Sequence, residues 1–467
     1  MKCLLIFATV WGLSMVLDLS GPCHAASVQT GWLAGLARVD VTPQESMWLA
    51  GYASRDHPSD GTLHPLFVKA LALKDGAGHQ ALLMTSDVLG FPKDMSDRIR
   101  DRLKDQFQLS RAEIILSSSH THSGPVLGDS IRVIYPLDEA QIEKIARYSA
   151  RLEGQVVECA ARALSSMKPA RLFSGNGITR FAVNRRNNPE AAILDNHDLK
   201  GPSDHAVPVL KVVGEDDALM AAAFGYACHA TVLASYQWCG DYPGFAQIEL
   251  EKAHPGATAL FFAGCGADQN ALPRRTVPLA QQYGRELAAA VERVLSENIN
   301  ELSPALKTEY KEVELAFGTP PTHEQLEGMA KTYTGYMQRA AQRLLKQLDD
   351  GKPLRTSYPY PVQIWRIGNQ ALVTLGGEVV VDYAILVKKT LGRETFVLGY
   401  CNDLMSYIPS VRVLHEGGYE GGDFQMGYGM PTKWADDIES RILAAARELA
   451  AKVGIAINDS AQGGIGP

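Results

Sequence analysis

Two histidines separated by one residue stand directly after an apolar run. His120 and His122 belong to the segment Ser117–Pro125 (SSSHTHSGP), which follows Ile114–Leu116. The apolar run predicts a buried strand, and the segment predicts a polar loop at its end. Residues i and i+2 of an extended backbone point to the same side, so both imidazoles would face one cleft. Neutral imidazole binds metal ions and acts as a general base near pH 7. A polar strand end with two surface histidines fits the same pattern.

Several other predicted strands end in the same manner, with small residues followed by a polar group. These groups are His229 after Leu219–Ala227, Asp268 and Asn270 after Ala257–Phe262, Glu378 after Gln370–Leu375, and the region of Tyr407 after Phe396–Gly399. Strand ends of a rigid sheet can present such groups to one cleft. Two or three histidines with one carboxylate suit Zn²⁺ that keeps an open position, and His120, His229 and Glu378 would form such a set. Taken alone, each residue also fits a buried or surface polar group that its neighbours satisfy.

Nucleophilic catalysis has weaker support in the sequence. No GxSxG motif is present, so a nucleophile elbow of the α/β-hydrolase type is not predicted. The serines Ser117–Ser119 and Ser123 would need a base in suitable geometry. Cys265, which has a glycine on each side, fits either a thiol nucleophile or a small residue packed in a tight turn.

The elements around these groups predict one α/β domain. The chain has 467 residues, of which 46% are hydrophobic and 21% are charged, and no repeat or low-complexity linker divides it. Short strands alternate with amphipathic helices, of which Gln141–Met167 is the clearest, and this predicts mixed β-sheets flanked by helices. A polar helix is expected near His323–Leu348 and a glycine-rich loop over Gly417–Met430. We place the domain at 27–456 and a flexible tail at 457–467.

The net charge is −7, and the basic residues are scattered along the chain. This pattern lacks the electrostatic footprint of a nucleic-acid-binding protein, and we expect no nucleic-acid partner.

The N-terminus has the layout of a secretory signal peptide over 1–26. Lys2 precedes the apolar run Cys3–Leu17, and small residues around Ala25 and Ala26 offer a cleavage site. The run is too short for a stable membrane span, so we expect a protein exported to the periplasm or the medium. Five cysteines would remain after cleavage, which allows at most two disulfides, and Cys228 with Cys239 is the first pair to consider.

The motifs together resemble one known family along nearly the whole predicted domain. They are Arg38–Thr42, Gly51-Tyr52, His120 with Thr121–Pro125, Asn184-Arg185, His229, the turn Gly264–Asn270, Gly377-Glu378, Tyr407-Ile408 and Tyr419–Gly421. In this set and order the chain resembles the catalytic domain of the neutral (non-lysosomal) ceramidases and their bacterial relatives. The resemblance implies one Zn²⁺ held by His120, His229, Glu378 and Tyr407. It also implies that His122, Arg185 and Tyr419 serve the substrate and the transition state.

The implied reaction is hydrolysis of an N-acyl amide in a ceramide-type lipid, which also implies transient contact with a membrane surface. The family's Gly-Asp-x-Ser-Pro-Asn turn corresponds to Gly266–Ala271, with Asn270 in place of the serine. An amide cannot be a nucleophile, so we expect attack by zinc-bound water. The family's additional β-sandwich domain is not expected in this protein. Two alternatives stay open, namely a zinc hydrolase for a different amide or ester and a non-catalytic binding protein that keeps the pocket.

Overall fold

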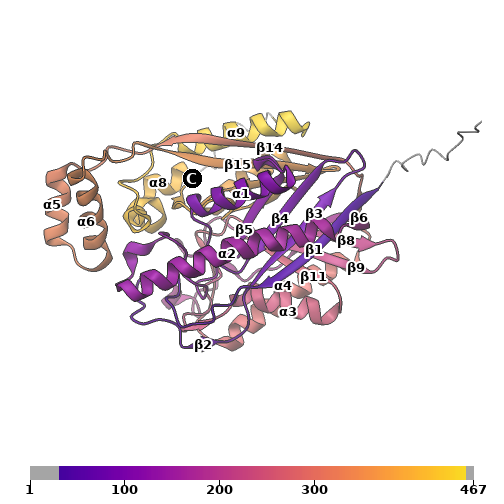
Figure 1. Cartoon of the computed structure of the whole chain (residues 1–467), viewed down its shortest axis with the longest axis horizontal. Coiled ribbons are helices and arrows are strands. Elements are labelled where there is room, and N and C mark those ends of the chain that lie inside the picture. The colour runs from indigo at the N-terminus through magenta and orange to yellow at the C-terminus, as the bar shows by residue number, and fades with distance from the viewer. Residues whose placement is uncertain (1–30, 459–467) are drawn as a thin grey trace, which may run out of the picture.

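The computed structural model describes residues 31–458. The predicted signal peptide (1–26) lies outside the described residues, as does the predicted tail except for its first two residues. The prediction of mixed sheets flanked by helices is confirmed, because two large sheets pack face to face between helices (Figure 1). The boundaries placed at 27 and 456 stay predictions.

The larger sheet has the order β11-β9-β8-β6-β1-β3-β4-β5, with β13 paired to β6. Its strands are β1 (Trp32–Asp40), β3 (Phe67–Lys74), β4 (Gln80–Ser86), β5 (Ile114–Ser118), β6 (Lys168–Ile178), β8 (Ala206–Gly214), β9 (Leu219–Tyr226), β11 (Thr258–Ala263) and β13 (Asn300–Leu302). β4 pairs in parallel with β5, and β9 in parallel with β11, whereas the pairs between them are antiparallel. The larger sheet is therefore mixed, with one parallel pair at each edge and antiparallel pairs between them.

The second sheet has the order β14-β15-β16-β18, and three two-stranded ladders lie near the strand ends. Its strands are β14 (Leu306–Ala316), β15 (Ser357–Ile367), β16 (Gln370–Leu375) and β18 (Phe396–Leu398). The ladders pair β2 (Gly61–Thr62) with β10 (Gln237–Trp238), β7 (Ala182–Asn184) with β12 (Gln269–Ala271), and β17 (Glu378–Val379) with β19 (Tyr407–Ile408).

The helices are α1 (Lys93–Phe107), α2 (Glu139–Ser165), α3 (Asp241–Ala253), α4 (Val277–Ser296), α5 (His323–Thr332), α6 (Gly335–Asp349), α7 (Val381–Leu391), α8 (Val411–Glu416) and α9 (Ile438–Val453). Most of them cover the outer faces of the two sheets, whereas α5 and α6 form a hairpin beyond the ends of β14 and β15 (Figure 1). The single helix expected near 323–348 is wrong, because the chain breaks between α5 and α6, where Gly335 has φ +64°. The expected loop at 417–430 contains two short helical turns, Tyr419–Asp423 and Gln425–Tyr428.

The strands of the larger sheet alternate between two apolar layers. In β3, Val68 and Ala70 pack in the layer that includes α2, whereas Leu71 and Leu73 pack in the layer that includes Trp365 of the second sheet. This period of two is what a strand buried on both faces requires. The resulting stack is rigid and positions the loops at its end.

One short segment of the second sheet joins both outer strands of the larger sheet. Leu398 forms a bridge with Gly264, just after β11, and Cys401 forms a bridge with Ser117 in β5. Asn402 strengthens this junction, because its side-chain oxygen accepts a hydrogen bond from the N–H of Leu116 at 3.0 Å. The residues that follow β5, β9, β11 and β16 are consequently held together at one end of the stack.

Among residues 31–458, no helix has the length and apolar character needed to cross a membrane. The five cysteines in this range are all free and buried, so the disulfide considered between Cys228 and Cys239 is absent.

The contact between β1 and α2 yields a stability prediction. A Cβ at Gly35 would stand 1.9 Å from the carbonyl oxygen of Ala163 in α2. Because both groups belong to packed backbone, we expect Gly35→Ala to lower the free energy of unfolding by about 1–3 kcal/mol. Gly154→Ala, also in α2, meets nothing within 4 Å and should raise that free energy by up to about 1 kcal/mol. Urea unfolding measures both, and equal effects would contradict the close packing.

Candidate active site

The turn after β5 directs His120 and His122 into the interior. His120 has φ +56°, which is left-handed, so the extended backbone expected across the two histidines is wrong. The imidazoles nevertheless converge, with their Nε2 atoms 3.3 Å apart. A non-glycine residue in this conformation is uncommon and is retained where surrounding contacts determine it. Here the Nδ1 of His120 hydrogen-bonds the carbonyl oxygen of Leu89 at 2.7 Å.

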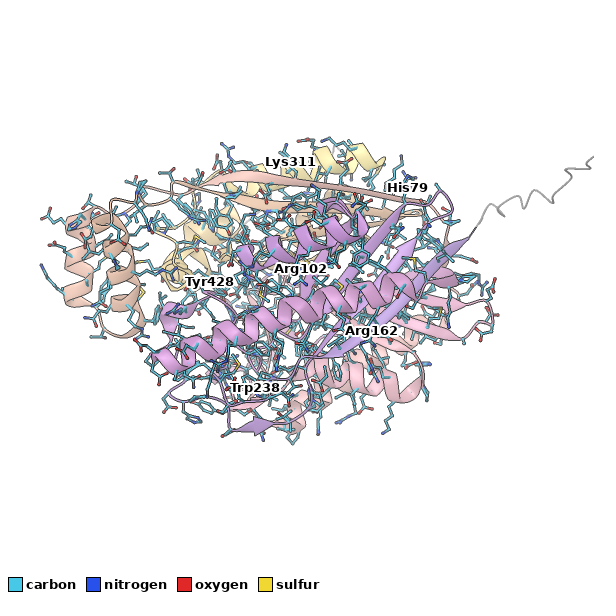
Figure 2. All side chains as sticks on the ribbon, in the orientation of Figure 1. His79, Arg102, Arg162, Trp238, Lys311 and Tyr428 are labelled. Carbon is cyan, nitrogen blue, oxygen red and sulfur yellow. The ribbon has the colours of Figure 1, made fainter. Side chains whose placement is uncertain are left out.

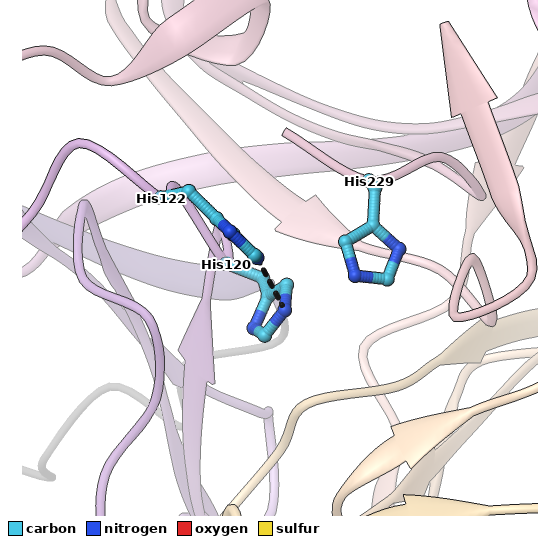
Figure 3. Close-up of side chains that lie close together, drawn as sticks. All are labelled: His120, His122 and His229. Carbon is cyan, nitrogen blue, oxygen red and sulfur yellow. Dashed lines mark hydrogen bonds between the residues drawn. The ribbon is translucent and has the colours of Figure 1, made fainter. Parts of the chain in front are cut away.

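His229 joins these two residues from the end of β9. One ring nitrogen from each of the three histidines lies within 4.8 Å of the other two, and the rings surround a common space (Figure 3). The Nδ1 of His229 hydrogen-bonds the carbonyl oxygen of Gly266 at 2.8 Å. This contact leaves Nε2 turned toward the cluster, as the Leu89 contact does for His120. Backbone carbonyls that fix Nδ1 are the usual arrangement behind metal-binding histidines.

Glu378 completes the cluster from the turn after β16. Its Oε2 lies 3.2 Å from Nε2 of His120 and 3.0 Å from Nε2 of His229. Its Oε1 accepts a short hydrogen bond from the hydroxyl of Tyr428. Gly377, at φ +72°, makes the approach possible, since a Cβ there would stand 2.7 Å from the carbonyl oxygen of Ser406.

Burial sets the charge state of the cluster. Burial, followed by the imidazoles of His120 and His229, lowers the pKa of His122 well below its ordinary value. Burial and then the guanidinium of Arg185 lower the pKa of His229 to about 4. Burial opposes ionisation of Glu378, but His120 and His229 hold the pKa of its carboxyl well below the usual range. Near pH 7 the cluster therefore presents the neutral imidazoles of His122 and His229 beside the carboxylate of Glu378.

The donor set fits a divalent metal ion. Neither Oε2 of Glu378 nor Nε2 of His229 has a hydrogen-bond partner of acceptable geometry, although the two atoms are close and fully buried. Buried polar atoms without partners are costly, and lone pairs that converge in this way suit a cation. Imidazole nitrogens with one carboxylate oxygen are the donors that Zn²⁺ prefers. The three-histidine group is therefore able to hold a metal ion.

His122 is held differently from the other two histidines. Its Nδ1 has no hydrogen-bond partner. The ring of Tyr52 packs against it at 4.7 Å between centroids. On another side, a Cβ at Gly51 would stand 2.3 Å from Nδ1, so only a glycine fits there. The dipeptide Gly51-Tyr52 thus shapes the seat of this imidazole by packing alone.

A second polar group lies beside the cluster and is centred on Arg185. Its guanidinium donates to Oε1 of Glu420 at 2.7 Å, to the hydroxyl of Tyr407 at 3.2 Å and to Oδ1 of Asn270 at 3.5 Å. Tyr419 lies 5.6 Å from this guanidinium, measured to its ring centroid, and 45% of the residue is exposed. The predicted residues Arg185, Tyr407, Tyr419 and Asn270 are therefore in one contact group.

Two short ladders join this group to the histidine cluster. Tyr407 is the register partner of Glu378 in the parallel pair β17–β19. Asn270 is bridged to His229, and its Oδ1 also accepts from the hydroxyl of Thr231 at 3.4 Å. All eight residues singled out from the sequence as catalytic or metal-binding consequently meet at one end of the sheet stack.

Asp268 has a structural place in the same region. It is fully buried and accepts hydrogen bonds from the N–H of Val381 at 2.8 Å and the amide of Asn184 at 3.0 Å. These contacts tie the turn after β11 to the start of α7 and to the end of β7. Burial raises the pKa of Asp268 to about 6.

The structure argues against the nucleophiles considered from the sequence. The hydroxyls of Ser117, Ser119 and Ser123 are buried and have no hydrogen-bond partner, so no base activates them. Burial raises the pKa of the Cys265 thiol well above its usual value, which keeps it protonated.

Three residues that sequence reasoning did not assign contact the site. Tyr428 holds Glu378, Glu420 holds both Arg185 and Arg186, and the ring of Tyr400 packs on His120 at 4.3 Å between centroids. Figure 2 shows Tyr428 on the side toward α5 and α6, with His79 of the β3–β4 turn toward the opposite end. Glu420 lies inside the Tyr419–Gly421 motif, so its sequence position offered a signal. The sequence offered no comparable signal for Tyr400 or Tyr428.

Comparison with known proteins gives these residues a family context. The family model described as neutral/alkaline non-lysosomal ceramidase, N-terminal, matches residues 32–310, more than half of the chain. The chain belongs to this family. The matched range includes His120, His122, Arg185, His229 and Asn270, whereas Glu378, Tyr407 and Tyr419 lie beyond it.

Two curated relatives come from Dictyostelium discoideum. The chain is 26% identical to neutral ceramidase B over 241 residues, which is 49% of this chain and 32% of that protein. It is 23% identical to neutral ceramidase A over 248 residues, 50% of this chain and 34% of that protein. The matched region thus spans about a third of the length of these relatives.

Solved structures show the same fold. Neutral ceramidase from Pseudomonas aeruginosa superposes with a TM-score of 0.70 at 19% identity, covering 94% of this chain and 76% of that one. A structure described as ceramidase complexed with C2 superposes with a TM-score of 0.69 at 19% identity, covering 94% and 77%. At this identity the likeness extends to the fold.

The seat of His122 yields a testable prediction. Gly51→Ala adds a methyl group against the imidazole, so we expect the ring to be displaced toward solvent and its pKa in the metal-free protein to rise toward the ordinary value. The control is Gly256→Ala, where φ is +96° and nothing lies within 4 Å, so it carries the backbone strain without the contact. NMR titration measures the pKa of His122 in the two variants. An unchanged pKa in Gly51→Ala would show that the glycine does not determine the ring position.

The contact between Tyr428 and Glu378 yields another. Removing the hydroxyl frees the carboxylate to rotate, and loss of such a supporting contact costs about 10–100-fold in metal affinity. We expect that loss of Zn²⁺ affinity in Tyr428→Phe, measured by competition with a chromophoric chelator. Tyr336→Phe is the matched control, because Tyr336 packs on the same Phe424 at 5.6 Å but does not contact Glu378. Equal affinity in the two variants would contradict the supporting role.

Proposed function

We propose that this protein is an exported zinc-dependent hydrolase that cleaves the N-acyl amide bond of a ceramide-type lipid. The observation that carries the proposal is the carboxylate oxygen of Glu378 placed between the Nε2 atoms of His120 and His229. Membership of the ceramidase family supports the reaction class. Export rests on the signal-peptide pattern of the sequence.

His120, His229, Glu378 and Tyr407 would hold the zinc ion. The first two present Nε2 because backbone carbonyls occupy Nδ1, and Glu378 presents Oε2 because Tyr428 occupies Oε1. When bound, zinc supplies Lewis acidity, which activates water as a nucleophile and polarises a carbonyl oxygen. With Asn270 in place of the family's serine, water is the nucleophile that this site can use.

His122 would carry protons. Its lowered pKa keeps the imidazole neutral near pH 7, so it can accept a proton from the attacking water and pass it to the leaving amine. The absence of a carbonyl contact at its Nδ1 supports this assignment over a ligand role. Its Nε2, at 3.3 Å from that of His120, is close enough to act at the same centre.

Arg185 and Tyr419 would stabilise the developing oxyanion. Glu420 and Tyr407 fix the guanidinium in place before substrate binds, which is how preorganised donors avoid reorganisation during the reaction. Desolvation of its hydroxyl and then the carboxylate of Glu378 raise the pKa of Tyr419 above its usual value, although 45% of the residue is exposed, so the hydroxyl stays protonated and can donate. Each such donor contributes about 3–4 kcal/mol where measured.

A second candidate is hydrolysis of another amide or ester. It is favoured by Asn270, whose side-chain oxygen is engaged by Arg185 and Thr231 at the place of the family's serine. The same zinc centre and donors would serve both reactions, and the difference lies in what occupies the acyl and amine sides.

The metal assignment is tested by variants of the two adjacent histidines. We expect one zinc per wild-type chain by inductively coupled plasma mass spectrometry, loss of zinc in His120→Ala, and retention of zinc in His122→Ala with hydrolysis reduced at least about 100-fold. A wild type without zinc would reject the metal centre. Equal zinc loss in both variants would make His122 a ligand and remove it from the proton-carrying role.

The substrate assignment is tested by fatty-acid release. The zinc-loaded protein is incubated with a ceramide carrying a labelled acyl chain, with His120→Ala as the inactive control. We expect release from the wild type alone. Zinc-loaded protein that leaves ceramide intact but cleaves other acyl amides or acyl esters would establish the second candidate in its place. Turnover of neither class by the zinc-loaded chain would favour a binding protein.

A further inference from the structure

A cavity of about 480 Å³ lies between α6 and the stretch of chain that leads into α2. In Figure 1 the α5–α6 hairpin and the start of α2 lie at the same end of the molecule. Four charged side chains line one part of the cavity, and apolar side chains line the rest. None of the residues assigned to the histidine centre or to its neighbouring donors is in the lining, so the cavity is a separate site.

The charged part of the lining has three guanidinium groups and one carboxylate. They belong to Arg132, Arg339, Arg343 and Asp129. Arg343 pairs with Asp129, and Nη1 of Arg132 lies 3.6 Å from the same carboxylate. The side chains of Arg132 and Arg343 are 40% and 45% exposed, so a ligand that enters from solvent can reach their N–H groups. The lining therefore carries two positive charges in excess.

Arg339 contributes its charge without a carboxylate partner. Its guanidinium donates to the carbonyl oxygens of Val133 and Ile134 at 2.8 and 2.9 Å, and it forms no ion pair with any residue of 31–458. Asp138, which precedes α2, is engaged elsewhere, because it accepts the N–H of Gln141 at 2.8 Å. The two carbonyl contacts hold the guanidinium in place, so little conformational freedom would be lost when a ligand binds.

An excess of two positive charges matches a phosphate monoester. Such a group carries a charge of about −1.5 to −2 at pH 7 and offers three acceptor oxygens. Guanidinium groups bind phosphate oxygens through pairs of N–H donors, and these charge-assisted hydrogen bonds are stronger than neutral ones. A carboxylate or a sulfate ester carries a single negative charge, so it would compensate only half of the excess.

The apolar part of the lining suits a hydrocarbon substituent on that ester. Val133, Leu137 and Ile142 are half-buried and line the same cavity, and the ring of Tyr135 adds to them. A ligand that covers these side chains gains from the removal of apolar surface from water. The volume lies within the usual range for pockets that enclose a small molecule, and inorganic phosphate alone would leave most of it empty.

We propose that this cavity binds a phosphate monoester with an apolar substituent, whose phosphate pairs with Arg132, Arg339 and Arg343. The site goes beyond the proposed hydrolysis, since it uses none of the residues of the histidine centre. A soluble alkyl phosphate and the head group of phosphatidic acid in a membrane both offer this chemistry, and the experiments below distinguish these two sources.

Calorimetric titration of the full chain with hexyl phosphate tests the proposal. We expect saturable binding whose affinity rises between about pH 5 and pH 7.5, because the second proton of a phosphate monoester leaves with a pKa of about 6. Hexyl sulfate, which has the same shape but one negative charge, should bind at least about tenfold more weakly. Inorganic phosphate, which lacks the hydrocarbon, should also bind at least about tenfold more weakly.

Substitutions of opposite sign locate the site. Arg343→Gln should weaken hexyl phosphate about tenfold, because it removes one charged donor. Asp129→Asn should strengthen it severalfold, because the carboxylate that competes with the ligand is gone. Lys346→Gln is the matched control, since Lys346 lies in the same helix, pairs with Asp350 and is not in the lining. It should bind as the wild type does, and thermal melts check that all three variants fold.

Two further measurements separate this site from the metal centre and identify the source of the ligand. Phosphate groups also bind metal ions, so His120→Ala should bind hexyl phosphate as the wild type does if the cavity is the site. Flotation with phosphatidylcholine vesicles that contain phosphatidic acid, abolished by Arg343→Gln, would assign the ligand to a lipid head group. Absence of flotation, with hexyl phosphate binding intact, would assign it to a soluble ester.

Each contrary outcome has a definite meaning. Absence of hexyl phosphate binding, binding unaffected by Arg343→Gln, or binding lost in His120→Ala would overturn the site. Hexyl sulfate that binds as tightly would overturn the monoester assignment, and inorganic phosphate that binds as tightly would overturn the apolar substituent. Failure of the wild type to release fatty acid from ceramide, with hexyl phosphate binding intact, would count against the proposed hydrolysis alone.

Discussion

The structure of the site depends on burying a carboxylate among imidazoles. Glu378 is 3% exposed, and an ionised carboxylate removed from water is tolerated only where charges or hydrogen bonds compensate. Tyr428 compensates Oε1 with a hydrogen bond, whereas Oε2 lies between His120 and His229 without a hydrogen-bond partner, which suits it to a bound cation. The need to compensate buried charge also applies to Arg185 beside the cluster, whose guanidinium is paired with Glu420. Charge balance at the centre therefore dictates side chains two contacts away.

Backbone conformation also serves this arrangement. His120, Tyr400 and Asn402 all have positive φ values without being glycine, and all three lie where β5 meets the segment after β18. Conformations of this kind cost of order 1–3 kcal/mol each and persist where the surrounding packing determines them. The sheets that enclose the junction supply that packing, so the rigidity of the stack is what allows the imidazole and the carboxylate to approach.

Much of the fold could be predicted from local patterns. The apolar run before His120, the paired strands before His229 and the amphipathic helix over α2 all follow from periodicity, and the structure confirms them. The positions of the histidines at strand ends indicated that they could converge. The backbone conformation that brings them together could not be predicted, because the left-handed turn at His120 has no sequence signature. The contacts of Tyr400, Glu420 and Tyr428 depend on how two sheets pack, and single-sequence patterns do not encode that. The break between α5 and α6 was also missed, since Gly335 alone within a polar helical pattern is a weak signal.

The bridges of Leu398 and Cys401 bear on how the molecule folds. Residues near 120, 229, 264 and 378 are far apart along the chain, and the bridges of Leu398 and Cys401 join the end of β11 to β5, which carry two of these positions. Closing such long loops costs entropy that only the finished contacts repay. The second sheet, which lies almost wholly beyond residue 310, must therefore dock before the centre exists. A nascent chain that has completed only the larger sheet would be folded in most of its core and still chemically inert.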